Sequence, residues 1–289
     1  MKRKQNRRTN KIRRYLQEFK VIYCIVRGLK SKERCVATLL QETNPKVFCA
    51  VETHLAGKEE KMEFEGYATH RLDGTNDSKG ILIAIKEELE SVTVELEDFT
   101  EVGQIKWLKI NNTRVKLRLG VVYAPQESRT LNKELKKMYE NIEKNAAEAE
   151  EERSLFVVMG DFNCKVGSYI RGNNETVTKG GRLLMKMTSN NDLDIVNTSE
   201  KTEGLWTRIQ GKEMSVLDYV VVNKEVTHKI NSLEIDEDRL YGIYREADSK
   251  RVYTDHNTMT LEMRIETRRK EKLTSRRISQ RRYKAYQEI

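Results

Sequence analysis

The chain has 289 residues, of which 37% are hydrophobic and 34% are charged, and its formal net charge is +9. A chain of this length holds one large domain or two small ones, and its longest early apolar run, Val21 to Val26, is too short for a signal peptide or a membrane span. Its four cysteines show no CxxC spacing, so we expect reduced residues of an intracellular protein rather than a disulfide-held secreted scaffold.

The first and the last predicted segments are basic tails, at residues 1–19 and 266–289. Residues 1–14 carry eight basic side chains and no acid, and residues 264–284 carry ten basic side chains against two acids. The body of the chain between them is net acidic. Such tails bind a polyanion by releasing its counterions, and they also serve as nuclear-import signals, so we expect a nuclear protein. The alternative is that they are solvated ends without a partner.

Short strands alternate with a few helices over residues 20–265, which we expect to form one domain because no Pro/Gly-rich linker divides them. In chain order, the apolar patterns predict strands at residues 21–26, 47–51, 80–85, 92–96, 105–110, 115–123, 155–159, 195–197, 205–209, 216–222 and 258–265. Helical spacing predicts helices at residues 31–41, 130–152 and 181–189, the first of them capped by Ser31. This alternation predicts an α/β protein of stacked sheets covered by helices.

One predicted strand ends in a polar cluster. The buried run Leu155 to Met159 is followed at once by Gly160-Asp161-Phe162-Asn163. One interpretation is an ordinary turn, because Asp and Asn side chains bond nearby backbone amides. The other is a functional site, which requires partners elsewhere in the chain.

Polar residues also end or interrupt other apolar runs. Asp218 is embedded inside an apolar strand, which is an expensive place for a carboxylate. The remaining residues of this kind follow or precede strands: Glu52, Tyr123, Asp255 and His256.

This set of side chains predicts phosphoester hydrolysis. Hard oxygen ligands such as Glu52 suit Mg²⁺ or Mn²⁺, and a metal beside a phosphodiester stabilises developing charge. Asp161 could orient and deprotonate an attacking water, and Asn163 and Tyr123 could donate to phosphate oxygens. His256, paired with a carboxylate, would contact the scissile phosphate. The residues alone do not say which ester is cleaved.

The ordered elements Glu52-Thr53-His54, Val122-Tyr123-Ala124-Pro125, Gly160-Asp161-Phe162-Asn163, Leu217-Asp218-Tyr219 and Asp255-His256 resemble the endonuclease/exonuclease/phosphatase superfamily, which includes DNase I and the apurinic endonucleases. The segments Gly180 to Thr198, Trp206 to Arg208 and Ser215 to Asn223 are similar to the endonuclease domain of non-LTR (LINE-type) retrotransposons. The resemblance implies a four-layer sandwich of two packed mixed β-sheets flanked by helices, which is a DNase I-like fold.

The resemblance also implies a role for each matching residue. Glu52 would be the metal ligand, with Asp255 helping to hold the metal or its waters. Asp161 would activate the nucleophilic water, and Asp218 would orient His256. For the remaining positions it implies phosphate or DNA contacts by Tyr123, Asn163, Arg27, Trp206 and Arg208. Mg²⁺, or Mn²⁺, is the implied cofactor, and DNA is the implied partner.

One position departs from the family pattern. The family opens with a strand ending in Asn-x-Arg-Gly-Leu, whose Asn helps to hold the metal site, but here Ile25 precedes Val26-Arg27-Gly28-Leu29. Ile has no oxygen to offer, so a catalytically degenerate DNA-binding remnant is an alternative to an active nicking enzyme. A small-molecule phosphoesterase of the same superfamily is a third hypothesis. No Tyr-x-Asp-Asp polymerase motif occurs in the sequence, so we expect at most the nicking half of a retroelement machinery.

Overall fold

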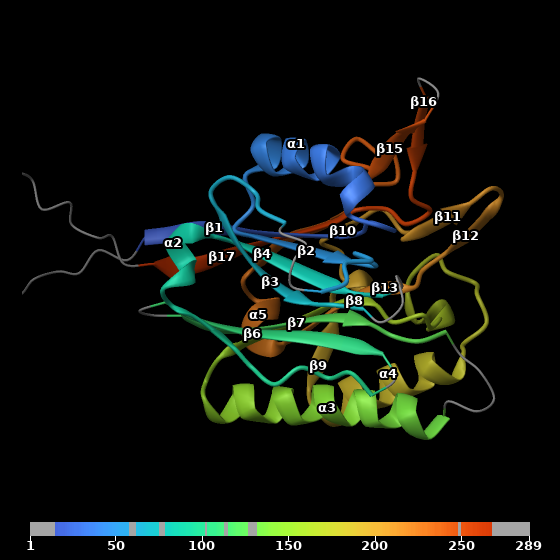
Figure 1. Cartoon of the computed structure of the whole chain (residues 1–289). Coiled ribbons are helices and arrows are strands. Elements are labelled where there is room, and N and C mark those ends of the chain that lie inside the picture. Colours follow the sequence, from blue (N-terminus) through green and yellow to red (C-terminus); the bar gives the residue numbers. More distant parts are fainter. Residues whose placement is uncertain are drawn as a thin grey trace, which may run out of the picture.

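Two β-sheets pack face to face in the computed structural model, and helices cover their outer faces (Figure 1). The structure describes residues 15–57, 62–74, 79–101, 103–112, 115–126, 132–247 and 250–267. Residues 1–14 and 268–289 of the predicted basic tails lie outside these residues. The expected four-layer α/β sandwich is confirmed.

The first sheet has seven strands. Their order is β10 (Thr202–Glu203), β14 (Ile230–Ile235), β17 (Met259–Thr267), β1 (Tyr15–Ile25), β2 (Val47–Val51), β4 (Ile81–Lys86) and β3 (Tyr67–Leu72). The short helix η1 (Lys30–Lys32) leads into α1 (Glu33–Thr43), whose apolar side chains pack on the outer face of this sheet.

The second sheet has six strands. Their order is β5 (Thr93–Glu95), β6 (Gln104–Asn112), β7 (Val115–Tyr123), β8 (Leu155–Asp161), β13 (Asp218–Asn223) and β9 (Leu193–Ile195). Helices α3 (Asn132–Glu151) and α4 (Lys179–Asn190) cover its outer face. The smaller helices are α2 (Glu87–Glu90), η2 (Gly167–Tyr169), η3 (Val196–Thr198) and α5 (Lys224–Thr227). Two hairpins, β11 (Arg208–Gln210) with β12 (Glu213–Ser215) and β15 (Tyr244–Ala247) with β16 (Lys250–Tyr253), complete the fold.

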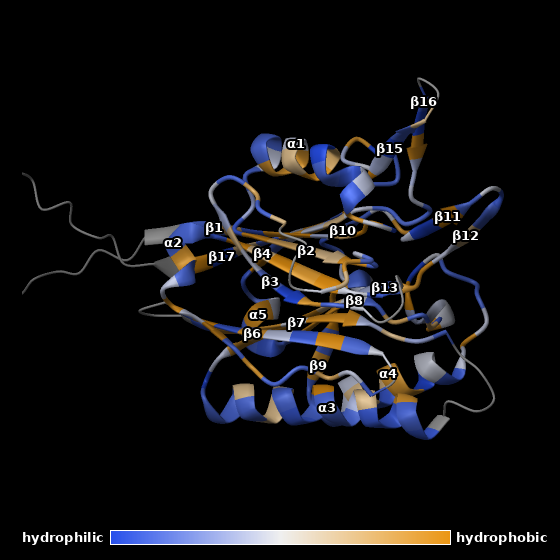
Figure 2. Ribbon diagram, in the orientation of Figure 1, coloured by the Kyte–Doolittle hydropathy of each residue, from blue (hydrophilic) through white to orange (hydrophobic). Residues whose placement is uncertain are grey.

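The largest apolar cluster lies between the two sheets and takes side chains from both. Strands β2 and β8 are buried at every residue, because each sheet is covered on both faces. The same strands appear as continuous hydrophobic stretches in the middle of the molecule, whereas the helices present hydrophilic residues outward (Figure 2). In the part of the chain that the structure describes, no helix is long and apolar enough to cross a membrane.

The structure corrects several details of the sequence prediction. Strand β1 begins at Tyr15, ahead of the domain boundary that we expected at residue 20. Ser31 does not cap a helix: Lys32 precedes α1 without a side-chain cap, and the Ser31 hydroxyl donates to the Gly28 carbonyl instead. Strands β3 and β14, absent from the prediction, have polar residues among their buried ones.

The sheet pairings bring distant polar residues to one end of the sandwich. Tyr123 at the end of β7 is paired with Asp161 at the end of the parallel strand β8. Asp161 is in turn paired with Asp218, the first residue of the antiparallel strand β13. In the other sheet, β1 and β2 are parallel and end together, with Ile25 opposite Val51. The carboxyl ends of these parallel strands therefore lie at the same rim of the molecule.

Candidate active site

The centre of this rim is a row of three paired residues, Tyr123, Asp161 and Asp218. The glycine before Asp161 is required by close packing: Gly160 has φ +151°, and a Cβ atom there would lie 2.0 Å from the carbonyl oxygen of Val122. Only glycine lets β7 and β8 approach this closely at the point where Asp161 is presented.

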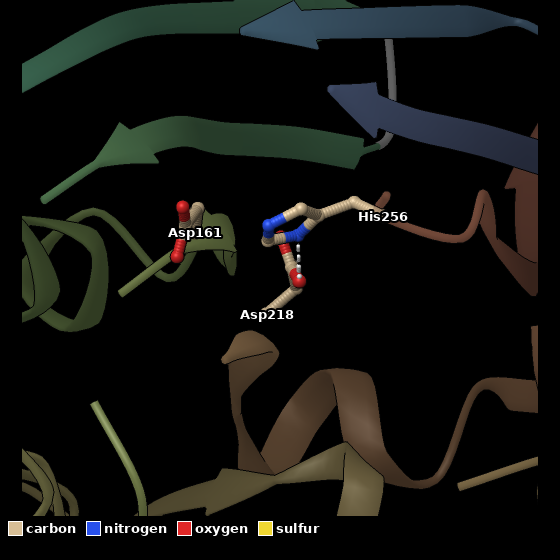
Figure 3. Close-up of side chains that lie close together, drawn as sticks. All are labelled: Asp161, Asp218 and His256. Atoms are coloured by element: carbon tan, nitrogen blue, oxygen red, sulfur yellow. Dashed lines mark hydrogen bonds and ion pairs between the residues drawn. The ribbon is translucent and has the colours of Figure 1, made fainter. Parts of the chain in front are cut away.

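Asp218 holds His256 by a buried hydrogen bond. The imidazole Nδ1 lies 2.7 Å from Asp218 Oδ2, and the Asp218 carboxylate is fully buried. Its other oxygen, Oδ1, accepts the hydroxyl of Tyr23 at 2.9 Å. The imidazole lies between the two carboxyl groups, with its second nitrogen on the side of Asp161 (Figure 3). The carboxylate is thus satisfied by protein donors, which explains how an apolar strand tolerates it.

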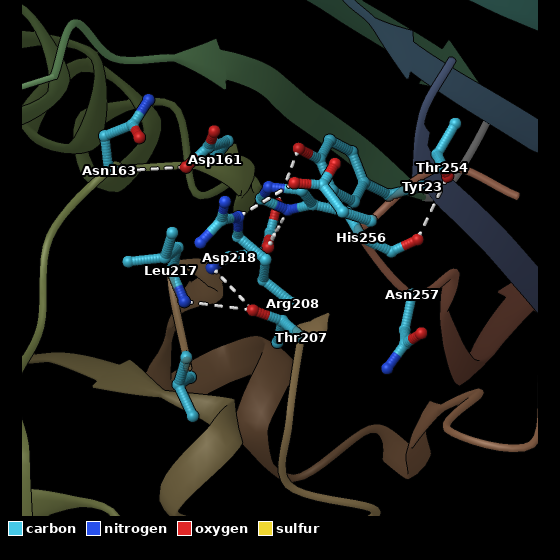
Figure 4. Close-up of polar contacts among 12 residues, drawn as sticks. Tyr23, Asp161, Asn163, Thr207, Arg208, Leu217, Asp218, Thr254, His256 and Asn257 are labelled. Carbon is cyan, nitrogen blue, oxygen red and sulfur yellow. Dashed lines mark hydrogen bonds and ion pairs between the residues drawn. The ribbon is translucent and has the colours of Figure 1, made fainter. Parts of the chain in front are cut away.

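The backbone around Asp218 is also fixed by buried polar side chains (Figure 4). The hydroxyl of Thr207 accepts the backbone N–H groups of Leu217 at 2.9 Å and of Asp218 at 3.1 Å. Asn197 donates to the Asp218 carbonyl at 3.2 Å and accepts the N–H of Val220 at 2.9 Å. These contacts set the position of the carboxylate before any substrate binds.

Asp161 is almost fully buried beside this pair. Burial, together with the negative charge of Asp218, raises the pKa of Asp161 well above its ordinary value. Its Oδ1 accepts the backbone N–H of Asn163 at 2.7 Å. Burial works to lower the pKa of His256, but the charge and hydrogen bond of Asp218 outweigh it and raise that pKa to about 9. The site therefore pairs a carboxyl group of increased basicity with a protonated imidazole at neutral pH.

A second group of charges adjoins the first. Glu52 Oε1 accepts the hydroxyl of Tyr123 at 2.9 Å, and Glu52 Oε2 lies 3.5 Å from Arg27 Nε. Asp255 accepts from Arg208 Nε at 2.9 Å and lies 3.0 Å from Arg27 Nη1. Burial raises the pKa of Asp255, but the charges of His256, Arg27 and Arg208 outweigh it and hold that pKa below its ordinary value.

Known proteins resemble this chain both in sequence and in fold. A family model described as endonuclease-reverse transcriptase matches residues 117–258, which contain Tyr123, Asp161, Asp218 and His256. This match covers just under half of the chain and shows a similarity in sequence to that family. No curated protein matches the sequence significantly.

Solved structures of superfamily proteins share the fold at low sequence identity. An AP endonuclease from Leishmania major is 12% identical with a TM-score of 0.66, over 86% of this chain and 88% of that one. The endonuclease domain of TRAS1, a telomere-specific non-LTR retrotransposon, is 16% identical with a TM-score of 0.58, over 86% and 99%. A 3′ phosphatase from Neisseria, bound to a product DNA hairpin, is 12% identical with a TM-score of 0.62, over 85% and 99%.

Superfamily members are hydrolases that act on phosphodiester bonds and generally use divalent metals. The donors of this protein fit such an ion in kind, because Glu52 and Asp255 offer hard carboxylate oxygens. Asp255 Oδ1 is buried and, within the described residues, has no hydrogen bond of good geometry, although Arg27 lies close to it. The ligand atoms of Asp161, Asp218 and His256 lie within 4.8 Å of one another.

The structure brings together some, but not all, of the site residues expected from the sequence. It brings together the six at the rim of the sheets: Glu52, Tyr123, Asp161, Asp218, Asp255 and His256. Asn163 is close by, but its side chain donates to the carbonyl of Ala124 at 2.7 Å. Arg27 and Arg208, expected to bind DNA, are ion-paired inside the site. Trp206 is partly buried against the core of the second sheet.

Sequence reasoning missed the residues that support the site. Tyr23 lies inside an apolar run and Thr207 lies inside the Trp-Thr-Arg segment. Neither residue was therefore recognised on its own as part of the site. A polar atom at an inward-facing strand position was the available signal, since Tyr23 and Ile25 share one face of β1. Ile25, which replaces the family Asn, is buried in the core between the sheets.

Proposed function

We propose that this protein is a divalent-metal-dependent endonuclease that nicks one strand of duplex DNA, as part of a retroelement. The observation that carries the proposal is the hydrogen-bonded Asp218–His256 pair beside Asp161, at the rim where Glu52 and Asp255 also meet. The similarity to a retrotransposon endonuclease domain supports the choice of substrate.

Asp161 is the proposed general base. Its Oδ1 is held by the N–H of Asn163, which leaves Oδ2 to accept the proton of an attacking water. A raised pKa makes this carboxylate a stronger base than an exposed one. The turn at Asn163 fixes the Asp161 carboxylate, which would orient the attacking water.

His256 is the proposed phosphate contact. Its Nδ1 is occupied by Asp218, so Nε2 donates to a phosphate oxygen, and the positive charge of the ring stabilises the pentacovalent transition state. The Tyr123 hydroxyl, which donates to Glu52 in the structure, would contact the same phosphate. Glu52 and Asp255 would hold the divalent cation, which polarises the phosphoryl group and stabilises the leaving oxygen.

The test is a plasmid-nicking assay with Mg²⁺. We expect the parent chain to convert supercoiled plasmid to the open circular form, and Asp161→Asn to lose at least about 100-fold in rate. Asp194→Asn is the matched control, because Asp194 pairs with Lys224 and Thr227 away from the site. A folded parent chain that does not nick, or an Asp161→Asn variant as active as the control, would rule out the proposed mechanism.

A degenerate, DNA-binding remnant is the second candidate, and Ile25 favours it. The side chain is 1% exposed and packs in the apolar core, so no oxygen is presented where the family has an amide. In that case the parent would bind DNA without nicking it, and Ile25→Asn would recover nicking. Because Asn at this position buries an amide in an apolar core, its folding has to be verified by circular dichroism first.

A further inference from the structure

The position of Arg27 is built by the fold rather than left to a flexible surface. The turn after β1 runs beside the turn after β2: Gly28 donates its N–H to the Glu52 carbonyl at 2.8 Å, and Leu29 donates to Thr53 at 2.9 Å. Beneath the turn, the buried Lys32 donates its ammonium to the carbonyl of Arg27 at 2.6 Å. Arg27 itself has φ +43°, a left-handed backbone conformation that is uncommon in a non-glycine residue.

The Arg27 guanidinium joins the two carboxylates that suit a metal. Nε faces Glu52 Oε2 at 3.5 Å, and Nη1 faces Asp255 Oδ1 at 3.0 Å. The second Asp255 oxygen is bound by Arg208. Both carboxylates are largely buried, with 17% and 10% of their side chains exposed. Unpaired, two such carboxylates would repel each other strongly.

We infer that Arg27 is an internal counter-cation that occupies the space between Glu52 and Asp255 and competes with the divalent cation for it. The Arg27 side chain is 51% exposed, so its charged end can leave toward solvent when the ion arrives. Binding of the ion then requires two ion pairs to be broken. The inference rests on the proposed function, from which we take the ion to be a divalent metal. It predicts that the site binds this ion weakly.

The displaced Arg27 guanidinium would also be free to bind a DNA phosphate. Once released from Glu52 and Asp255, it remains attached to the turn that borders the site, where a DNA phosphate would lie. Metal binding and phosphate contact by Arg27 would therefore be coupled, because one event frees the group that the other uses. This reconciles the ion pairs in the structure with the DNA contact expected from the sequence.

The test is direct measurement of Mn²⁺ binding by electron paramagnetic resonance, in the absence of DNA. We expect Arg27→Gln to tighten the Mn²⁺ dissociation constant about tenfold relative to the parent chain, equivalent to about 1.4 kcal/mol. Arg34→Gln is the matched control, since it removes the same charge from an exposed position of α1. The rise in melting temperature on adding Mn²⁺ should be larger for Arg27→Gln than for either of the others.

An unchanged or weaker Mn²⁺ constant in a folded Arg27→Gln variant would overturn the inference. The result is separable from the nicking assay. Tighter binding in the variant without nicking by the parent would support the counter-cation and count against the endonuclease. Nicking by the parent with equal Mn²⁺ dissociation constants in all three chains would support the endonuclease and count against the counter-cation.

Discussion

Tyr23 shows how a single buried hydroxyl orders the residues of the candidate site. Burial, with the nearby charges of Asp218 and Asp161, raises the pKa of Tyr23 well above its ordinary value, so the phenol stays protonated and acts as a donor. It fixes one oxygen of Asp218 while His256 fixes the other. Asp218 can therefore neither rotate nor turn to solvent, and the imidazole it holds has one orientation.

Tyr23→Phe should loosen this arrangement without emptying the core. We expect a loss of about 1–3 kcal/mol in the free energy of unfolding, because Asp218 Oδ1 is left buried without its donor. The turnover number should fall about tenfold or more with little change in KM. A misoriented His256 stabilises the transition state less, whereas substrate binding does not depend on its orientation. Tyr139→Phe is the control, since it removes a buried hydroxyl that donates to the Gly180 carbonyl. Equal kinetic losses in both variants would show that Tyr23 has no positioning role.

The Asp218–His256 pair should make stability depend on pH. His256 has a pKa of about 9 in the folded protein against an ordinary value of 6.5, so folding favours its protonated form. The stabilisation is fully present below about pH 6.5 and is lost as the pH rises toward 9, a loss on the order of 3 kcal/mol.

Thermal melting in a chelator should detect this loss. The parent chain should lose stability between pH 6.5 and 9 relative to Asp218→Asn, which keeps an oxygen for Tyr23 but removes the charge that raises the pKa of His256. Parallel pH profiles of the two proteins would contradict the assignment.

At the scale of the element, the end of β8 carries both a packing residue, Gly160, and a residue of the candidate site, Asp161. The strand has to pass close to β7, which requires Gly160, and has to present Asp161 immediately afterwards. The glycine of the Gly-Asp-Phe-Asn segment is therefore a packing residue that fixes where the acid lies.

Gly160→Ala should destabilise the protein by about 3 kcal/mol or more, because the added methyl group meets backbone atoms that cannot move aside independently. Gly211→Ala is the control. It also has a positive φ, of +63°, but its methyl group would meet no described atom within 4 Å, so only the backbone strain of about 1 kcal/mol remains. Urea unfolding of the two variants compares the costs, and equal values would show that the strand approach is not tight.

Sequence reasoning located the elements whose apolar runs are uninterrupted. The bounds of β2 match the prediction, because its apolar run in a doubly covered sheet stops where the strand stops. The bounds of β7 also match, although Lys116 and Arg118 interrupt its apolar residues. Strand β3 was missed because its side chains are buried at only some positions, in a pattern that is neither alternating nor continuous. The acids at strand ends were found by the same rule that found the strands.

The contacts within the site could not be predicted from the apolar pattern of the sequence. That Arg27 faces Glu52 and Asp255 depends on a left-handed turn and on sheet register, neither of which leaves a local signal. The same holds for Tyr23, whose partner Asp218 is far away in the chain. Long-range pairing decides these contacts, and apolar periodicity carries no information about it.

At the scale of the whole molecule, the described ends of the chain lie far from the candidate site. Tyr15, the first residue of β1, is paired with Thr267, the last of β17, whereas the site adjoins Ile25 at the other end of β1. At the usual rise along a strand, about 33 Å separate the two ends of β1. The basic segments 1–14 and 268–289, which lie outside the described residues, are thus attached at the end opposite the site.

Deleting residues 1–14 and 268–289 should therefore change affinity and leave chemistry intact. We expect weaker DNA binding at low salt and a shallower dependence of log K on log salt concentration, because fewer counterions are released. The rate of nicking at saturating DNA should stay within about twofold of the parent, because these segments are attached far from His256 and Asp161. Fluorescence anisotropy over a salt series measures the slope, and an unchanged slope would show that the ends of the chain do not bind DNA.

The two sheets are joined at the rim by a pair of reciprocal tyrosine contacts. Tyr23 reaches from the seven-stranded sheet to Asp218, and Tyr123 reaches from the six-stranded sheet to Glu52. The residues of the candidate site therefore lie between the two sheets, and neither sheet alone carries the complete set. A substitution in the core between the sheets that shifts one sheet past the other, even without unfolding either, should move Asp161 away from Glu52 and Asp255 and abolish the proposed activity.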